Sequence, residues 1–190
     1  MPVSPILDLP TPLAIVCHDA GAANLMFAWM LSALAERPSS TLEWRVHLSG
    51  PAERIWLGLG EKRVKCLSTF ELALDGATTL LSGTGWASDL EHRARSLAAL
   101  RGISSIAVID HWVNYLARFE RDGEQQLPNA VWVTDDYASQ IAWRNFPYIP
   151  VFKHPNLYLA AQLADIVPPP AKPFTVLYIA CLLYTSPSPR

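Results

Sequence analysis

Two pairs of adjacent His and Asp residues stand directly after apolar runs of the chain: His18-Asp19 near the N-terminus, and Asp110-His111 in its middle. A carboxylate can hold two sugar hydroxyls or accept a proton, and an imidazole can move a proton near neutral pH. Both pairs are therefore candidates for a general base or a hydroxyl-binding pair, ranked Asp110, His111, Asp19, His18. The alternative for the second pair is that Asp110 caps a following helix while His111 is exposed.

A glycine-containing segment, Gly83-Thr84-Gly85, also follows an apolar run and precedes a well-marked helix. Backbone N–H groups and the positive end of that helix could hold a phosphate or a carboxylate. The alternative is a tight strand–helix turn that uses glycine for a positive φ. The segment matches neither a Walker loop nor GxGxxG, which disfavours a P-loop NTPase or a simple NAD enzyme.

Further polar and aromatic side chains complete the candidate substrate-binding set. Asp135, followed by Asp136, is a ligand or metal candidate, although an N-cap for a helix over 136–145 is the simpler interpretation. No spacing of Cys and His residues resembles a zinc site, so we expect no metal. The remaining substrate-binding candidates are Gly21, Asn24, Trp86 and Asn114.

The elements that must position these residues alternate along the chain. Apolar or β-branched runs predict strands at 13–17, 42–48, 63–67, 78–82, 104–109 and 130–134, and an edge strand at 148–152. Helical patterns lie between them at 24–36, 49–57, 70–74, 88–101 and 136–145. This alternation predicts an α/β, Rossmann-like, mostly parallel sheet with helices on both faces. Ligands of such sheets bind beyond the carboxyl ends of the strands, so the candidate residues should meet along one rim.

The best-marked helix is expected over 88–101. Ser88 and Glu91 match a capping box, and Gly102 would close the C-terminus. The apolar face is formed by Leu90, Ala94, Leu97 and Ala98. Glu91 and Arg95 are therefore expected on the polar side of the helix.

Composition excludes several classes of function. The chain has 190 residues with a formal charge of −2, which gives no electrostatic footprint for nucleic acid. Cys17 and Cys66 lie in strand patterns, are expected to be buried, and form no disulfide framework, which fits a reducing cytoplasm. The longest apolar stretch, 20–31, is too short to span a bilayer.

The chain divides into five parts. Residues 1–12 carry four prolines without a basic region and are expected to be a disordered leader rather than a signal peptide. A Rossmann-like domain is expected over 13–167, followed by a Pro-rich linker at 168–173 and the first strand of a second domain at 174–180. The last ten residues, CLLYTSPSPR at 181–190, read as a translated sequencing adapter, because the adapter DNA TGT CTC TTA TAC ACA TCT CCG AGC CCA CGA encodes them codon for codon. We therefore expect native sequence to end near Ala180, inside a longer protein.

Four stretches of the chain are considered together: VCHDAGAAN at 16–24, GTGWASDLE at 83–91, AVIDHWVNY at 107–115 and VWVTDDY at 131–137. They resemble the N-terminal half of GT-B-type glycosyltransferases and, more narrowly, proteins of bacterial surface-polysaccharide gene clusters. The resemblance covers most of residues 13–180 and is at the level of a superfamily.

This resemblance implies two Rossmann-like domains that face each other across a cleft. The N-terminal domain would bind a sugar or glycan-precursor acceptor, and the C-terminal domain, its missing partner, would bind a nucleotide-sugar donor. It implies transfer of a sugar to a surface-glycan precursor, with no bound metal and no cofactor in this part of the chain. One of Asp110, His111, Asp19 and His18 would act as base on the acceptor hydroxyl, and the chain alone would be inactive.

Alternatives to a glycosyltransferase remain, because fold analogy does not separate functions. One is a nucleotide-sugar epimerase or hydrolase of the same architecture. Another is a non-catalytic sugar-binding or assembly module. The resemblance also leaves peripheral membrane association open.

Overall fold

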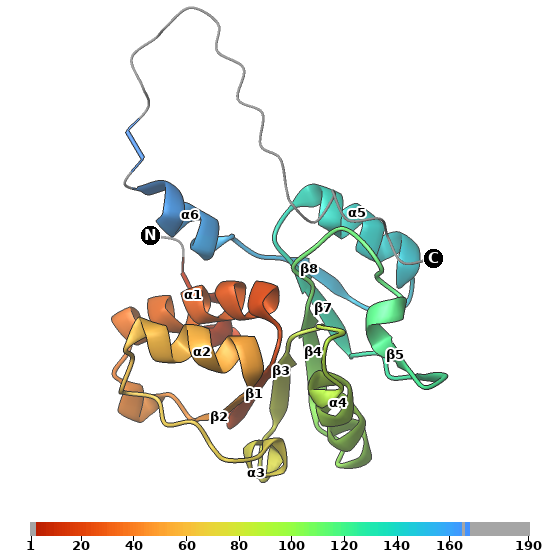
Figure 1. The fold of residues 1–190 in the computed structure, drawn as a ribbon, viewed down its shortest axis with the longest axis horizontal. Helices are drawn as coiled ribbons and strands as arrows, with labels where there is room; N and C mark the ends of the chain where they lie inside the picture. The colour runs from red at the N-terminus through yellow and green to blue at the C-terminus, as the bar shows by residue number, and fades with distance from the viewer. Residues whose placement is uncertain (1–2, 165, 168–190) are drawn as a thin grey trace, which may run out of the picture.

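The computed structural model describes residues 3–164 and 166–167 and is built around one six-stranded parallel sheet (Figure 1). The strand order is β2-β1-β3-β4-β7-β8, and every neighbouring pair is parallel. The strands are β1 Leu13–Cys17, β2 Trp44–Leu48, β3 Thr79–Ser82, β4 Ser104–Val108, β7 Ala130–Val133 and β8 Val151–Lys153. The predicted α/β, Rossmann-like fold is confirmed.

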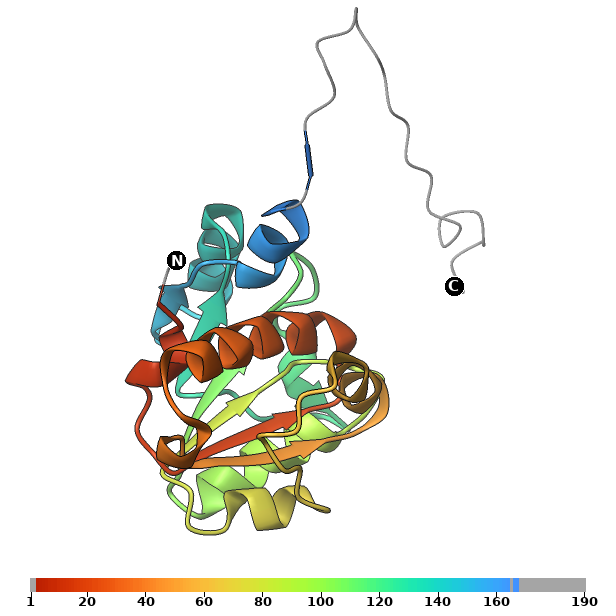
Figure 2. The same ribbon diagram turned by 90° about the vertical axis from the view of Figure 1, so that its left-hand side faces the viewer.

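Helices cover both faces of the sheet. One face carries α1 Ala20–Glu36, α2 Gly50–Leu59 and α6 Leu157–Ala164, and the other carries α3 Phe70–Leu74, α4 Leu90–Leu100 and α5 Asp136–Asn145. Figure 2 shows α1 on one side of the strands and α3 with α4 on the other. Alternate residues of β1 pack on opposite faces, Ile15 toward α1 and Val16 toward α3 and α4. All five residues of β1 are buried, as expected for a central parallel strand.

Short elements complete the fold. They are the 3-10 helices η1 Pro5–Asp8, η2 Ser39–Thr41 and η3 Ala117–Phe119, and a hairpin of β5 Glu120–Arg121 with β6 Glu124–Gln125. The hairpin and η3 lie between β4 and β7, a region for which no regular element was predicted.

The strand predicted at 63–67 is wrong as a strand, but its position beside the sheet is informative. Only one parallel bridge forms there, between Val46 of β2 and Cys66. Counted with this bridge, the parallel segments run in the order 3-2-1-4-5-6-7, which begins as the doubly wound dinucleotide-binding order does. The chain reverses its direction of winding between β1 and β3, so the crevice beyond these two strands is the expected ligand position.

The N-terminal segment differs from the prediction of a disordered leader. Residues 3–12 are ordered, with Ile6 buried in the core beside α1. The hydroxyl of Ser4 is also buried and donates a hydrogen bond to the carbonyl oxygen of Trp29 at 2.6 Å. The segment packs against α1 because that helix is apolar on more than one side, and sequence periodicity does not reveal what covers the second side.

Three other expectations are corrected. Helix α1 begins at Ala20 rather than at residue 24, because the carboxylate of Asp19 accepts a hydrogen bond from the N–H of Ala22 at 3.0 Å. Cys66 is exposed, whereas Cys17 is buried as predicted. The last strand runs over Val151–Lys153 rather than 148–152, and its position at the sheet edge is confirmed.

The expected linker at 168–173, second-domain strand at 174–180 and adapter segment at 181–190 lie outside the described residues. Within the part of the chain that is described, no helix combines the length and apolarity needed to cross a membrane.

Candidate functional site at the carboxyl ends of β1, β3 and β4

A pocket of about 220 Å³ opens beyond the carboxyl ends of β1, β3 and β4, at the point where the sheet changes its direction of winding. It is lined by Asp19, Gly85, Trp86, Asp110, His111, Val113 and Arg118. The rim predicted from the sequence therefore exists, and five of the candidate residues share one pocket. They come from three loops that are far apart in the chain.

Asp110 is held in the pocket by Arg118. The guanidinium donates a hydrogen bond from Nη1 to Asp110 Oδ1 at 2.9 Å, and the same nitrogen donates to Thr84 Oγ1 at 3.1 Å. Arg118 is buried, and its Nε donates to the carbonyl oxygen of Val113 at 3.1 Å. The ion pair therefore fixes the direction of the carboxylate instead of leaving it free in solvent. The predicted alternative for Asp110 is wrong, because the loop after β4 contains no helix that it could cap.

The other oxygen of Asp110 lies against the first turn of α1 at Gly21. A Cβ added to Gly21 would overlap Asp110 Oδ2 and would lie 2.6 Å from Asp110 Cγ. The first turn of a helix presents unpaired N–H groups and a partial positive charge, which favours a nearby carboxylate. Gly21 therefore positions Asp110 by allowing this close approach.

Glu91 anchors the loop that carries His18 and Asp19. Its side chain is fully buried, and Oε1 accepts hydrogen bonds from the backbone N–H groups of His18 at 2.7 Å and Asp19 at 3.1 Å. The predicted capping box is therefore wrong: Ser88 Oγ accepts from the N–H of Leu90 at 3.2 Å, while Glu91 turns inward. Burial raises the pKa of the Glu91 carboxyl, and the two N–H groups oppose that rise.

The glycines after β3 make room for these contacts. A Cβ on Gly83 would lie 2.9 Å from Glu91 Oε1, and a Cβ on Gly85 would lie 2.6 Å from the Cβ of Asp19. Neither glycine has a positive φ, so the predicted explanation from backbone conformation is wrong. Close packing between the loops after β1 and β3 is the physical reason for both glycines.

Arg95 is the second charged residue of α4 that turns inward. Its Nη1 donates to the carbonyl oxygen of Gly83 at 2.9 Å and to Ser82 Oγ at 3.2 Å, and its guanidinium lies over the ring of Phe119 at 5.0 Å. Burial lowers the pKa of Arg95 to about 10, although nearby Glu91 raises it. Among the described residues, the buried side-chain atoms without a hydrogen-bond partner are Glu91 Oε2, Arg95 Nε and, away from this pocket, His154 Nε2.

His111 lines the pocket, whereas His18 does not. The Nδ1 of His111 accepts a hydrogen bond from the N–H of Trp112 at 2.9 Å, so the neutral ring carries its proton on Nε2 and can donate from there. His111 is exposed at the pocket. His18 packs instead against Gly50, whose φ of +56° and missing side chain accommodate the ring, and it does not line the pocket.

The remaining candidates have structural contacts of their own. Asp135 caps α5, as the simpler interpretation predicted: Oδ1 accepts from the N–H of Ala138 at 2.7 Å. Its Oδ2 accepts from Trp112 Nε1 at 3.0 Å, which ties α5 to the loop after β4. Thr84 is buried and donates from Oγ1 to the carbonyl oxygen of Val108 at 3.0 Å. Asn24 and Asn114 do not line the pocket.

Sequence reasoning missed three residues of this site: Arg118, Glu91 and Arg95. Arg118 stands at η3, where no apolar run or turn motif marks it. Glu91 and Arg95 are one turn apart on a helix that otherwise has an amphipathic pattern, so they resembled a solvated face. The sequence offers one weak signal, Gly83, because a glycine leaves space for a side chain from another element to approach the backbone.

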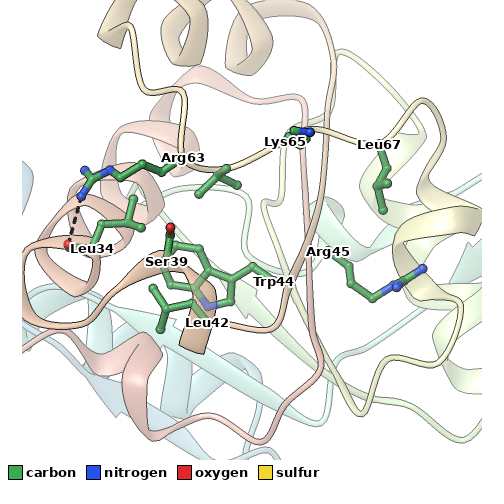
Figure 3. A pocket seen from close by; sticks show the side chains of 9 residues that line it. Leu34, Ser39, Leu42, Trp44, Arg45, Arg63, Lys65 and Leu67 are labelled. Atoms are coloured by element: carbon green, nitrogen blue, oxygen red, sulfur yellow. Dashed lines mark hydrogen bonds between the residues drawn. The ribbon is translucent and has the colours of Figure 1, made fainter.

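A second cavity of about 330 Å³ lies at the amino end of β2, which is an edge strand of the sheet (Figure 3). Its cations are already engaged in part, since Arg63 donates to the carbonyl oxygen of Leu34 at 3.1 Å and Arg45 to that of Leu72 at 2.8 Å. Its lining contains no carboxylate, histidine or cysteine. Of these two cavities, only the first is lined by carboxylates and a histidine.

No group of three or more His, Cys, Asp or Glu side chains suited to a metal ion occurs in the described part of the chain. Comparison with protein families, with curated proteins and with solved structures found no match to this chain.

Proposed function

We propose that this chain is the acceptor-side domain of a glycosyltransferase that moves a sugar from a nucleotide-sugar to a surface-glycan precursor. The observation that carries the proposal is the pocket itself, in which an oriented carboxylate, an imidazole N–H and an exposed indole converge at the winding reversal of the sheet. Carboxylates accept sugar hydroxyls, and an aromatic face suits the C–H face of a sugar ring. Such a combination favours a hydroxyl-rich ligand over a purely apolar one.

Each side chain has a role in the proposed transfer. The acceptor hydroxyl binds Asp110, which takes its proton as the oxygen forms a bond to the anomeric carbon of the donor. The bond from that carbon to the nucleoside diphosphate breaks, and the diphosphate leaves with the electron pair. His111 donates from Nε2 to an oxygen of the bound sugar, Asp19 offers a second carboxylate, and Arg118 positions Asp110.

The donor would be bound by a domain encoded beyond position 180. Resequencing the gene from genomic DNA tests this part, because the proposal requires the gene to encode a second α/β domain. The product of that gene should then release nucleoside diphosphate from a nucleotide-sugar only when an acceptor is present. Release of diphosphate without an acceptor would identify a hydrolase, and a changed sugar configuration would identify an epimerase.

The acceptor half can be tested with the present chain. Ligand-observed saturation-transfer NMR with glucose, galactose, rhamnose and N-acetylglucosamine should give saturable contact with at least one sugar. Asp110→Asn and His111→Ala should each reduce that contact, whereas Trp143→Ala on the exposed side of α5 should not. The proposal is refuted if none of these sugars binds saturably, or if both pocket variants bind as the wild type does.

A further inference from the structure

Two exposed aromatic residues lie directly beside the pocket, on the side of α5. Trp112 follows pocket residue His111 in the loop after β4 and is 53% exposed, and Tyr137 in the first turn of α5 is 61% exposed. Their ring centroids are 5.7 Å apart in an edge-to-face arrangement. We call these two residues the aromatic platform.

The aromatic platform is held in place by polar contacts. Trp112 Nε1 donates to Asp135 Oδ2, and the other oxygen of Asp135 caps α5, the helix that carries Tyr137. The indole is therefore fixed from the sheet side by the loop after β4 and from the helix side by α5. Exposed aromatic side chains that are fixed in this manner mark binding sites more often than chance exposure does, because a rigid ring loses little conformational entropy on binding.

The aromatic platform is connected to the pocket through the ring of His111. The imidazole of His111 and the indole of Trp112 have centroids 6.2 Å apart, and the phenol of Tyr137 lies next to that indole. Trp86, which also lines the pocket, is exposed, and its ring lies 6.0 Å from the guanidinium carbon of Arg118. Aromatic side chains therefore stand both in the lining of the pocket and next to it.

We propose that the aromatic platform is a subsite for a further sugar ring of the acceptor, so that the chain recognises an oligosaccharide rather than a single sugar. The proposal deepens the proposed function and rests on it. A ring bound at Asp110 and His111 would place its linked neighbour over Trp112, with Tyr137 at its edge. Indole, imidazole and carboxylate groups that lie next to one another suit a chain of hydroxyl-bearing rings. A protein interface would be expected to have an apolar centre with the acidic residues at its rim.

The test compares sugars of increasing length on the whole 190-residue chain. Affinities are measured for N-acetylglucosamine, glucose, galactose and rhamnose, each as the single sugar and as its di- and trisaccharide, by titration of ¹⁵N-tryptophan-labelled protein. We expect the longer forms of the bound sugar to bind about tenfold more tightly than the single sugar, with a shift of the Trp112 indole N–H signal. Trp112→Ala should remove this preference for length, and Trp112→Phe, which keeps a ring but loses the bond to Asp135, should retain part of it. Trp143→Ala is the matched control, because Trp143 is exposed to a similar degree as Trp112 and neither lines the pocket nor belongs to the aromatic platform.

Two results would overturn the subsite while leaving the proposed function intact: single and longer sugars binding equally, or Trp112→Ala keeping the full preference for length. Trp112-dependent self-association in analytical ultracentrifugation, without a length preference, would assign the aromatic platform to a protein contact instead. Saturable binding of no sugar at all would fail the proposed function first, so the two failures are distinguishable.

Discussion

Removing the carboxylate of Glu91 should release the loop that carries His18 and Asp19. Two backbone N–H groups donate to a single fully buried oxygen of this residue. A buried donor left without a partner costs about 1–3 kcal/mol. Since water can reach part of this loop, we expect Glu91→Ala to lower the free energy of unfolding by about 2–4 kcal/mol in total.

Glu91→Gln separates the hydrogen bonds from the charge. The amide oxygen can still accept from both N–H groups, so this variant should keep most of the stability that Glu91→Ala loses. Burial raises the folded-state pKa of Glu91 above its unfolded value. The stability that this group contributes is therefore fully present below about pH 4, near the unfolded carboxyl pKa, and is lost as the pH rises through the raised pKa of the folded state. Glutamine does not titrate, so the stability of Glu91→Gln relative to the wild type should increase from pH 4.5 to pH 8.

Urea denaturation followed by tryptophan fluorescence at several pH values measures both effects. Exposed Glu53 on α2 supplies the control, since Glu53→Gln should stay within about 0.5 kcal/mol of the wild type. The anchoring role is wrong if Glu91→Ala unfolds within the same margin. The interpretation of the buried charge is wrong if Glu91→Gln parallels the wild type at every pH.

Three further predictions concern the pocket and its supports. Gly21→Ala should weaken both sugar binding and stability by displacing Asp110, whereas Gly58→Ala, whose added Cβ meets no atom within 4 Å, should stabilise the chain by about 0.5–1 kcal/mol in urea denaturation. Arg118→Met should lower the free energy of unfolding by about 3 kcal/mol or more, because it leaves Asp110 unpaired. Adding Asp110→Asn should recover part of that loss. If the two single-mutant losses simply add in a double-mutant cycle, the ion pair is contradicted. Asp135→Ala should lower the free energy of unfolding by about 1 kcal/mol through loss of the α5 cap. Asp135→Asn, which can still cap the helix, should keep the wild-type value, and unfolding followed by circular dichroism measures both.

Several features of this protein follow from the sequence alone. The run 13–17 was predicted as a strand and forms β1 with the same bounds, and the run 104–109 forms β4 over all but its last residue. Apolar periodicity is local, so it can be recognised without knowledge of any partner. The rim of polar residues after the strands followed from the same reasoning, since parallel strands must present their carboxyl ends on one side. Asp19, Asp110 and His111 were placed correctly in this way.

The tertiary structure alone decided which polar groups are buried and what each one contacts. Glu91 reaches N–H groups 72 and 73 residues earlier in the chain, and Arg118 reaches Asp110 across a loop that has no regular pattern. Such pairings depend on the distance between elements in space. The sequence pattern of α4 is the same whether its charged residues face solvent or a neighbouring loop. The glycines at 83 and 85 show the same limit: the sequence favours a turn there, and only the packed loops show that Gly83 makes room for Glu91 and Gly85 for Asp19. The sequence thus determines where chemistry can gather, whereas long-range packing determines which groups are held ready for it.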